Sequence, residues 1–404
     1  MVKASPVTML LLFILVLIYC GLYYGRTVPL RRFIPLQSDA TTTLPPNFNS
    51  ENIRVLQFNI LADGLAGLRS DKGKFSRLSE NCDEIYWKYR RGNLLKEITQ
   101  YDPDVITMQE NDHFYDFFLP TLTARGYDGL FAPKPLSSCL DVSPNSDGCS
   151  IFVKRDRLRV CSAETLTFAL SNAETSLEEK SEIEWNPKDL LKRTQNQVAL
   201  ITLCELCNKE GEPLIGPPPI IIGTTHLKAA KSASGERIRQ GEVTQLLRTV
   251  NSLHDNFAQR DAEPVVVLTG DFNALPLGNY KYDSLTYKTI KSDKLNLKSV
   301  YNDDLNRQKG PISSNIQKNG NEVYTTWKAR RRRDGGEKVV KHCIDYIFYG
   351  PKVPSGDSPG LGVSSILDIY SDSEVGKQLL PSKIYPSDHL ALCANLMISW
   401  DKHD

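Results

Sequence analysis

Hydrophobic and polar positions along the chain alternate with two periods, which predict strands and helices in mixed order. Apolar, β-branched runs bounded by turn residues are typical of buried strands, whereas apolar residues spaced three and four apart predict helices. Strands are expected over residues 54–61, 104–110, 147–153, 196–206, 218–227, 265–271, 342–350 and 388–398, and helices over 85–100, 114–126 and 235–253. Several strands follow one another without a helix between them. We therefore predict an α/β fold in which two mixed β-sheets pack face to face with helices outside.

The N-terminal residues show neither period. Residues 7–24, VTMLLLFILVLIYCGLYY, carry no charge, and their length approaches the roughly 20 apolar residues that a transmembrane helix needs. The run is long for the apolar part of a signal peptide, and no A-x-A-like site follows it. Basic residues are more numerous after the run (Arg26, Arg31, Arg32) than before it (Lys3). We predict a retained membrane anchor with the rest of the chain facing the cytosol, on the endoplasmic reticulum or the mitochondrial outer membrane.

The same pattern divides the chain into four parts. They are a short N-terminal segment (1–6), the transmembrane anchor (7–24), a linker (25–51) and one folded domain (52–404). The linker interpretation depends on residues 37–50, which are rich in Thr, Pro and Asn and have no periodicity. Residues 171–195 are rich in Glu and Lys, and we expect them to form a solvated insertion outside the core.

Composition excludes some classes of protein. The chain has 404 residues, of which 40% are hydrophobic, and a formal net charge of +1. A near-neutral balance argues against a protein that coats nucleic acid non-specifically. The nine cysteines are scattered, and the C-x-x-C pair Cys204 and Cys207 has no second pair to complete a zinc site. We interpret them as reduced thiols in a core, in a reducing compartment.

Polar residues cluster at the ends of the predicted strands. Burying an unpaired polar group costs roughly 1 to 3 kcal/mol, so a fold that places many of them at strand ends is expected to gather them into one network. Taken singly, each residue also fits a turn or a satisfied core position; Asp271 and Asn273, for example, suit an Asx turn. The set comprises Asn59, Gln109, Glu110, His226, Lys228, Asp271, Asn273, Asp345, Asp388 and His389.

The chemistry of this set favours a hard cation and a phosphoester. Carboxylate and amide oxygens are the ligands that Mg²⁺ prefers. The chain has no H-E-x-x-H zinc motif, no G-x-S-x-G nucleophile elbow and no Walker loop. Metal-assisted attack of water on phosphorus is the chemistry that remains.

The order of these motifs is similar to that of the exonuclease-endonuclease-phosphatase superfamily. Asn59, Glu110 in "QE", His226 in "TTHLK", "GDFNALP", Asp345 in "IDY" and His389 in "SDH" occur in that order, and the resemblance spans residues 54–399. The segments "FAPKPLSSCLDVSPNSDGCSIF" and "YTTWKARRR" resemble the nocturnin branch. This resemblance implies an Mg²⁺-dependent phosphatase that removes the 2′-phosphate of NADP⁺ and NADPH.

The resemblance also implies a role for each residue. Glu110 would hold Mg²⁺, with Asn59 and Asp388 near the metal. Asp271 would orient or deprotonate the attacking water, which Asn273 would help to position. His226 would donate to a phosphate oxygen, and Asp345 would hydrogen-bond His389. The substrate phosphates would contact the cationic side chains Lys134, Lys228, Lys231 and Arg330.

One position departs from the nocturnin pattern. Nocturnins have an arginine two residues after the "HLK" lysine, where this chain has Ala230 followed by Lys231. Lysine is a poorer bidentate partner for phosphate than arginine, so affinity or substrate preference is expected to differ.

Other functions stay open at this point. A poly(A)-specific 3′-exoribonuclease would need a basic groove with stacking aromatics, of which only the short cluster at Arg330 is visible. A catalytically silent membrane adaptor and a phosphodiesterase acting on phosphoinositides or sphingomyelin are further alternatives.

Overall fold

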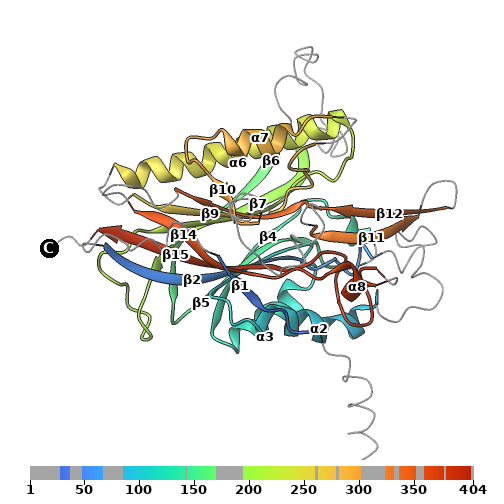
Figure 1. Ribbon diagram of the computed structural model, residues 1–404, viewed down its shortest axis with the longest axis horizontal. Helices are drawn as coiled ribbons and strands as arrows, with labels where there is room; N and C mark the ends of the chain where they lie inside the picture. The colour runs from blue at the N-terminus through green and yellow to red at the C-terminus, as the bar shows by residue number, and fades with distance from the viewer. Residues whose placement is uncertain are drawn as a thin grey trace, which may run out of the picture.

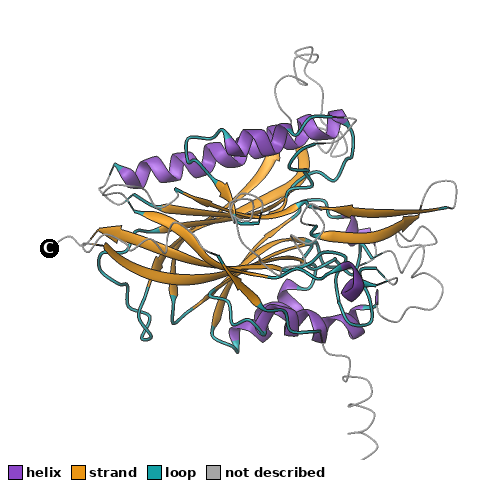
Figure 2. Ribbon diagram, in the orientation of Figure 1, coloured by secondary structure: helices purple, strands orange, loops and turns teal. Residues whose placement is uncertain are grey.

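Two β-sheets packed face to face form the centre of the molecule (Figures 1 and 2). The computed structural model describes residues 28–36, 48–66, 85–141, 143–169, 194–259, 263–278, 282–301, 324–331, 336–351, 359–376 and 379–401. The first sheet has the order β1 (Phe33–Pro35), β14 (Gly360–Leu367), β15 (Leu392–Asp401), β2 (Phe48–Asn59), β3 (Val105–Gln109), β5 (Gly148–Lys154) and β4 (Tyr127–Pro133). The second sheet has the order β10 (Lys298–Ser299), β13 (Asp345–Gly350), β9 (Val265–Asp271), β8 (Ile220–His226), β7 (Thr194–Leu206) and β6 (Leu158–Ala169).

Each sheet contains one parallel pair of strands, β2 with β3 and β8 with β9. Parallel neighbours need a crossover connection, which a helix usually supplies. Helix α2 (Trp87–Thr99) lies between β2 and β3 in the chain, and α6 (Ala233–Ala258) lies between β8 and β9. The two helices cover the outer faces of opposite sheets (Figure 1). The carboxyl ends of these four strands therefore meet at one edge of the sandwich, where Asn59 lies beside Gln109 and His226 beside Asp271.

The core between the sheets is apolar except for a series of hydrogen-bonded polar side chains that crosses it. All residues of β3, β8 and β9 are buried, and burying one Val, Leu or Ile side chain contributes about 1.5 to 3 kcal/mol. Gln57 Nε2 donates to Gln109 Oε1 at 2.6 Å, and Gln109 Nε2 donates to Thr224 Oγ1 at 2.9 Å. Gln57 also donates to Asp345 Oδ1 at 3.3 Å. These hydrogen bonds join the two sheets directly beneath the edge at which the parallel strands end.

The predicted fold class is confirmed, with differences in detail. The expected helix over 114–126 is a π-helical turn, Phe114–Phe118, followed by a short α3, Leu119–Thr123. Strands β4, β6 and β14 were not expected, nor was a separate two-stranded ribbon formed by β11 (Thr326–Arg331) and β12 (Glu337–His342). Two short helices, α7 (Leu285–Lys291) and α8 (Asp372–Val375), and a 3₁₀ helix, Ser138–Asp141, complete the described elements.

Part of the range expected to be a linker is built into the first sheet. Strand β1 pairs with the edge strand β14, and β2 already begins at Phe48. Arg31 is 6% exposed and forms an ion pair with Glu97. Its guanidinium also donates to the carbonyl of Asp368 at 3.1 Å. The folded body therefore starts before residue 52, the boundary expected from the sequence.

Two of the sequence predictions fall on residues that the structure does not describe. The expected anchor, residues 7–24, lies outside the described residues, as does most of the expected insertion; only its last residues, 194 and 195, are described, in β7. In the described part of the chain, no helix combines the length and the apolar character needed to cross a membrane. None of the seven described cysteines forms a disulfide, and six of them are buried.

Candidate active site

The ends of the two parallel strand pairs bring Asn59, Glu110 and Asp271 together. Asn59 Nδ2 donates to Glu110 Oε1 at 3.2 Å and to Asp271 Oδ2 at 3.0 Å. Its Oδ1 accepts the backbone N–H of Leu61 at 3.1 Å. Asn59 is fully buried, and Asp271 is 2% exposed. One amide group thus bridges two carboxylates that belong to different sheets.

The backbone is strained where the chain leaves the strands. Glu110 has φ +57° and Asn273 has φ +49°, conformations that cost about 1 to 3 kcal/mol each for residues other than glycine. Asp271 Oδ1 accepts the N–H of Asn273 at 2.9 Å, as in an Asx turn. Asn273 Nδ2 donates to the carbonyl of Leu227 at 3.0 Å. Asp271 and Asn273 therefore belong both to the turn and to the polar cluster.

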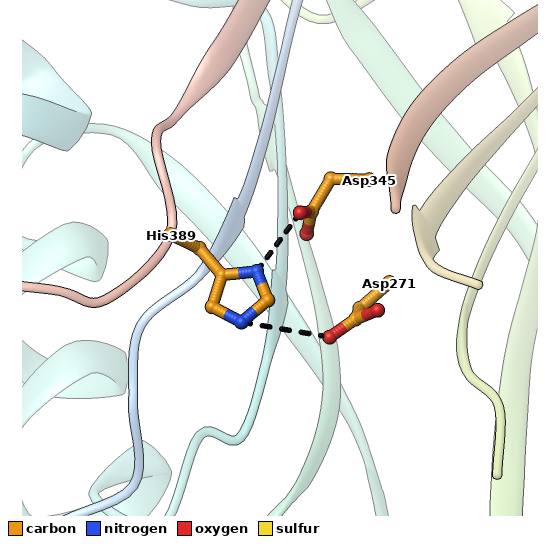
Figure 3. Close-up of side chains that lie close together, drawn as sticks. All are labelled: Asp271, Asp345 and His389. Carbon is orange, nitrogen blue, oxygen red and sulfur yellow. Dashed lines mark hydrogen bonds and ion pairs between the residues drawn. The ribbon is translucent and has the colours of Figure 1, made fainter. Parts of the chain in front are cut away.

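His389 lies between two carboxylates (Figure 3). Its Nδ1 is 2.8 Å from Asp345 Oδ2, and its Nε2 is 3.8 Å from Asp271 Oδ2. Burial lowers the pKa of His389, but the charges of Asp345 and Asp388 and the hydrogen bond to Asp345 together outweigh burial and the charge of Lys328, so the pKa is raised. Lys328 Nζ is 3.0 Å from Nε2. When Lys328 donates to Nε2, the ring is neutral. A second proton on Nε2 would break this hydrogen bond, while the ammonium could keep its ion pair with Asp388.

Asp271 and His226 have shifted pKa values. Burial and the charge of Asp345 raise the pKa of Asp271. Burial and the nearby Lys134 lower the pKa of His226 to about 4, so its imidazole is neutral near pH 7. His226 Nε2 is 3.6 Å from Asp271 Oδ2, and its Nδ1 is buried without a hydrogen-bond partner among the described residues. A carboxylate with a raised pKa, flanked by two imidazoles, suits general-base chemistry.

The donors at this edge fit a divalent cation. In the described residues, Asp271, Asp345 and His389 offer ligand atoms that all lie within 4.8 Å of one another. Glu110 accepts from Asn59 and from the N–H of Ala62 at 3.1 Å, and no lysine or arginine of the described ranges forms an ion pair with it. Charged oxygens of this kind suit Mg²⁺.

Asp388, which the sequence places near the metal, forms an ion pair with a buried lysine. Its Oδ2 pairs with the ammonium of Lys328, and its Oδ1 is 3.9 Å from His389 Nε2. The lysine neutralises this carboxylate, which leaves it less available to a cation than Glu110.

Lys134 is buried beside the cluster and already has a partner. Its Nζ lies 2.6 Å from Asp147 Oδ2, and Ser137 Oγ also donates to Asp147. Burial would lower the pKa of Lys134, but Asp147, and further Glu110, raise it. A substrate phosphate at Lys134 would therefore share the ammonium with Asp147.

The other expected substrate contacts are spread along two segments. Lys228 and Lys231 are exposed; the N–H of Lys228 donates to Glu242 Oε2 at 2.9 Å. The carbonyl of Ala230, at the position that departs from the nocturnin pattern, accepts from Arg239 at 2.6 Å. Arg330 lies in β11 opposite Lys338, and its side chain is outside the described part of the structure.

Two buried cations at the site were not anticipated from the sequence. Lys328 contacts Asp388 and His389. Arg90 on α2 donates to the carbonyls of Ile60, Leu61 and Pro386 at 3.0, 2.8 and 3.1 Å, which ties the segment after Asn59 to the segment before Asp388. Strand alternation offered one signal, because Lys328 is on the same face of β11 as Arg330. Nothing in the local sequence distinguishes Arg90 from its exposed neighbour Arg91.

Comparison with known proteins agrees with this geometry. The model of the Endonuclease/Exonuclease/phosphatase family matches residues 56–389. Nocturnin of Mus musculus is 32% identical over 377 residues, which cover 93% of this chain and 71% of that protein. Nocturnin of Homo sapiens is 33% identical over 365 residues, covering 90% and 68%. The structure of the human Nocturnin catalytic domain with bound sulfate anion superposes with a TM-score of 0.56 at 29% identity, covering 91% of this chain and 97% of that one. The chain is a nocturnin-like member of the endonuclease/exonuclease/phosphatase family.

Proposed function

We propose that this phosphoester hydrolase is an Mg²⁺-dependent phosphatase that removes the 2′-phosphate of NADP⁺ and NADPH, giving NAD⁺ and NADH. The similarity to nocturnins supports the substrate class. The observation that carries the proposal is the position of Asp271: one amide joins it to Glu110, and two imidazoles flank it. A water-activating group thus lies next to a cation site.

Each residue at the site has its own role in the proposed hydrolysis. Mg²⁺ held by Glu110, with Asn59 beside it, would neutralise charge on the phosphoryl oxygens. Asp271 accepts the proton of the attacking water, for which its raised pKa suits it. Asn273 positions that water and the phosphate. The neutral imidazole of His226 donates to a phosphoryl oxygen.

Asp345 holds His389 by its Nδ1, so that Nε2 points towards Asp271 and the reacting group. Lys134 and Lys228 provide positive charge for the substrate phosphates, with Lys231 and Arg330 further out along their segments. Asp388 acts through its pairing with Lys328 and His389.

The proposal includes the site of action in the cell. We propose that residues 7–24 tether the enzyme to the endoplasmic reticulum or mitochondrial outer membrane, with the catalytic domain in the cytosol. Fractionation of cells expressing the full chain, with and without these residues, tests the tether. Protease accessibility in intact organelles tests the orientation.

Parallel assays test the activity. The full chain, purified in a mild detergent with Mg²⁺, is offered NADP⁺, NADPH and 5′-labelled poly(A) RNA, with Glu110→Ala as the blank. We expect phosphate release from the dinucleotides and intact RNA. Shortened RNA without phosphate release would identify an exoribonuclease instead. Inactivity on all three substrates would favour a silent adaptor or a different phosphodiester substrate.

A further inference from the structure

The ribbon formed by β11 and β12 is attached to the catalytic cluster at its base. It projects from the side of the sandwich (Figure 1). Thr325, just before β11, donates from Oγ1 to Asp345 Oδ2 at 2.5 Å and accepts the N–H of Asp345 at 3.1 Å. Thr326 Oγ1 donates to the carbonyl of Asp388 at 2.7 Å, and its backbone forms a β-bridge with His389. One end of the ribbon thus contacts Asp345, Asp388 and His389 of the cluster.

Lys328 extends this attachment into the side-chain network. Its side chain is 6% exposed, and its ammonium pairs with Asp388 and lies 3.0 Å from His389 Nε2. Because Asp345 occupies Nδ1, both ring nitrogens of His389 have a partner. The imidazole is therefore fixed in rotation by contacts at two ends, one from β13 and one from β11.

The ion pair with Asp388 alone would account for a buried lysine, since a buried charge needs a partner. It does not account for the second contact. An ammonium has three N–H groups on a flexible stem and can turn towards several partners. Here it lies between the carboxylate of Asp388 and the imidazole of His389, so its position fixes the spacing of these neighbouring groups.

We propose that Lys328 is a positioning residue, which holds the His389 imidazole and the Asp388 carboxylate in the arrangement that phosphoester hydrolysis requires and links them to the β11–β12 ribbon. The inference rests on the hydrolase function proposed above. Without the ammonium, Nε2 loses the Lys328 contact, the buried Asp388 carboxylate loses its ion pair with Lys328, and the ring can rotate away from Asp271. A misplacement of about 1 Å in such a site costs on the order of 10²-fold in rate.

Steady-state kinetics with NADP⁺ and Mg²⁺ provide the first test, on the full chain in detergent. We expect Lys328→Met to lower kcat by roughly 10- to 100-fold while KM changes by less than about threefold, because the contact supports the reacting groups rather than substrate binding. Lys341→Met is the matched control. Lys341 belongs to the same ribbon but stacks over Trp327 at 4.1 Å and pairs with Asp372, away from the cluster. Normal kcat in Lys328→Met, or an equal loss in the control, would overturn the proposal.

A spectroscopic test does not depend on activity. The chain has six histidines, so selective ¹⁵N labelling gives a spectrum in which His389 is assigned by loss of its signals in His389→Gln. We expect Lys328→Met to shift the Nε2 signal of His389 in the protein without substrate, and Lys341→Met to leave it in place. If wild type does not hydrolyse NADP⁺, the proposed function fails, yet the spectra still decide the role of Lys328. Unchanged His389 signals in Lys328→Met would refute it.

Misfolding of the variant is a separate outcome that a second substitution resolves. Loss of the positive charge beside the buried Asp388 carboxylate is the expected cause, so Lys328→Met combined with Asp388→Asn is expected to fold. The His389 spectrum of this double variant should still show the shifted Nε2 signal. A wild-type Nε2 signal in the folded double variant would contradict the proposal.

Discussion

Glu242 is predicted to make the stability of the protein depend on pH near neutrality. It is fully buried on α6, where Oε2 accepts the N–H of Lys228 and Oε1 has no hydrogen-bond partner among the described residues. Burial raises the pKa of its carboxyl from 4.5 to about 7, against the Lys228 N–H and the charges of Arg239, Lys228 and Lys134. The folded protein therefore keeps this proton to a higher pH than the unfolded chain does.

Proton linkage gives the direction and the size of the effect of Glu242 on the free energy of unfolding. Between about pH 4.5 and pH 7 the unfolded chain releases the Glu242 proton first, so the free energy of unfolding falls as pH rises and levels off above pH 7. One pKa unit corresponds to about 1.4 kcal/mol, so the loss across this window is roughly 3 kcal/mol. Glu242→Gln keeps a side-chain oxygen for the Lys228 N–H and cannot ionise. We therefore expect the free energy of unfolding of Glu242→Gln not to show the fall caused by ionisation of Glu242.

Urea unfolding at several pH values between 4.5 and 8 measures the effect. The difference in unfolding free energy between Glu242→Gln and wild type should rise with pH by about 3 kcal/mol and then level off. Glu164→Gln, at an exposed position of β6, is the control and should run parallel to wild type. A Glu242→Gln curve that also runs parallel to wild type would refute the reasoning.

Three further predictions concern single side chains. Gly270→Ala should lower the free energy of unfolding by about 3 kcal/mol, because φ is +146° and the new Cβ would lie 2.1 Å from a carbonyl oxygen of the adjacent strand. Thermal unfolding measures this loss. Gly92→Ala on α2 is the control; its new Cβ would enter open space, so it should be neutral or stabilising. Lys134→Met should destabilise by about 3 to 5 kcal/mol, because the buried Asp147 carboxylate loses its only ion pair among the described residues. Adding Asp147→Asn should recover most of that loss in the same urea assay. Glu110→Gln should weaken Mg²⁺ binding measured by calorimetry at least about tenfold, because it removes one of the two carboxylates that accept from Asn59. Unchanged binding would move the cation to the cluster around His389.

The sequence allowed prediction of those parts of the fold that depend on local pattern. The runs that became β2, β3, β8 and β9 are apolar and end in polar residues, because both members of each parallel pair are buried and lead into the same edge. Strand β6 gives a weaker signal, since most of its residues are exposed. Its place in the sheet depends on pairing with β7 across about 40 residues.

The parts of the site that the sequence did not reveal depend on long-range contacts. Lys328 and Asp388 are 60 residues apart, and Arg90 and Pro386 are 296 apart. A lysine or arginine within a charged segment has the composition of a solvated surface, and only the fold shows that these two are buried. Their partners are backbone carbonyls and a carboxylate, which no side-chain motif marks.

Arg31 and β1 determine where the protein can be shortened. A form that starts after residue 36 would leave Glu97 as a buried charge without its guanidinium, a loss of about 3 to 5 kcal/mol. It would also uncover the edge of β14, whose free N–H and C=O groups could pair with another molecule and promote aggregation. Proteolysis or alternative initiation that leaves the folded domain intact must therefore act upstream of Val28, whose side chain is already in the core. The tether proposed for residues 7–24 would thus be separated from the folded domain by residues 25–27 alone, and only a cut within this short stretch would remove the proposed tether without damage to the fold.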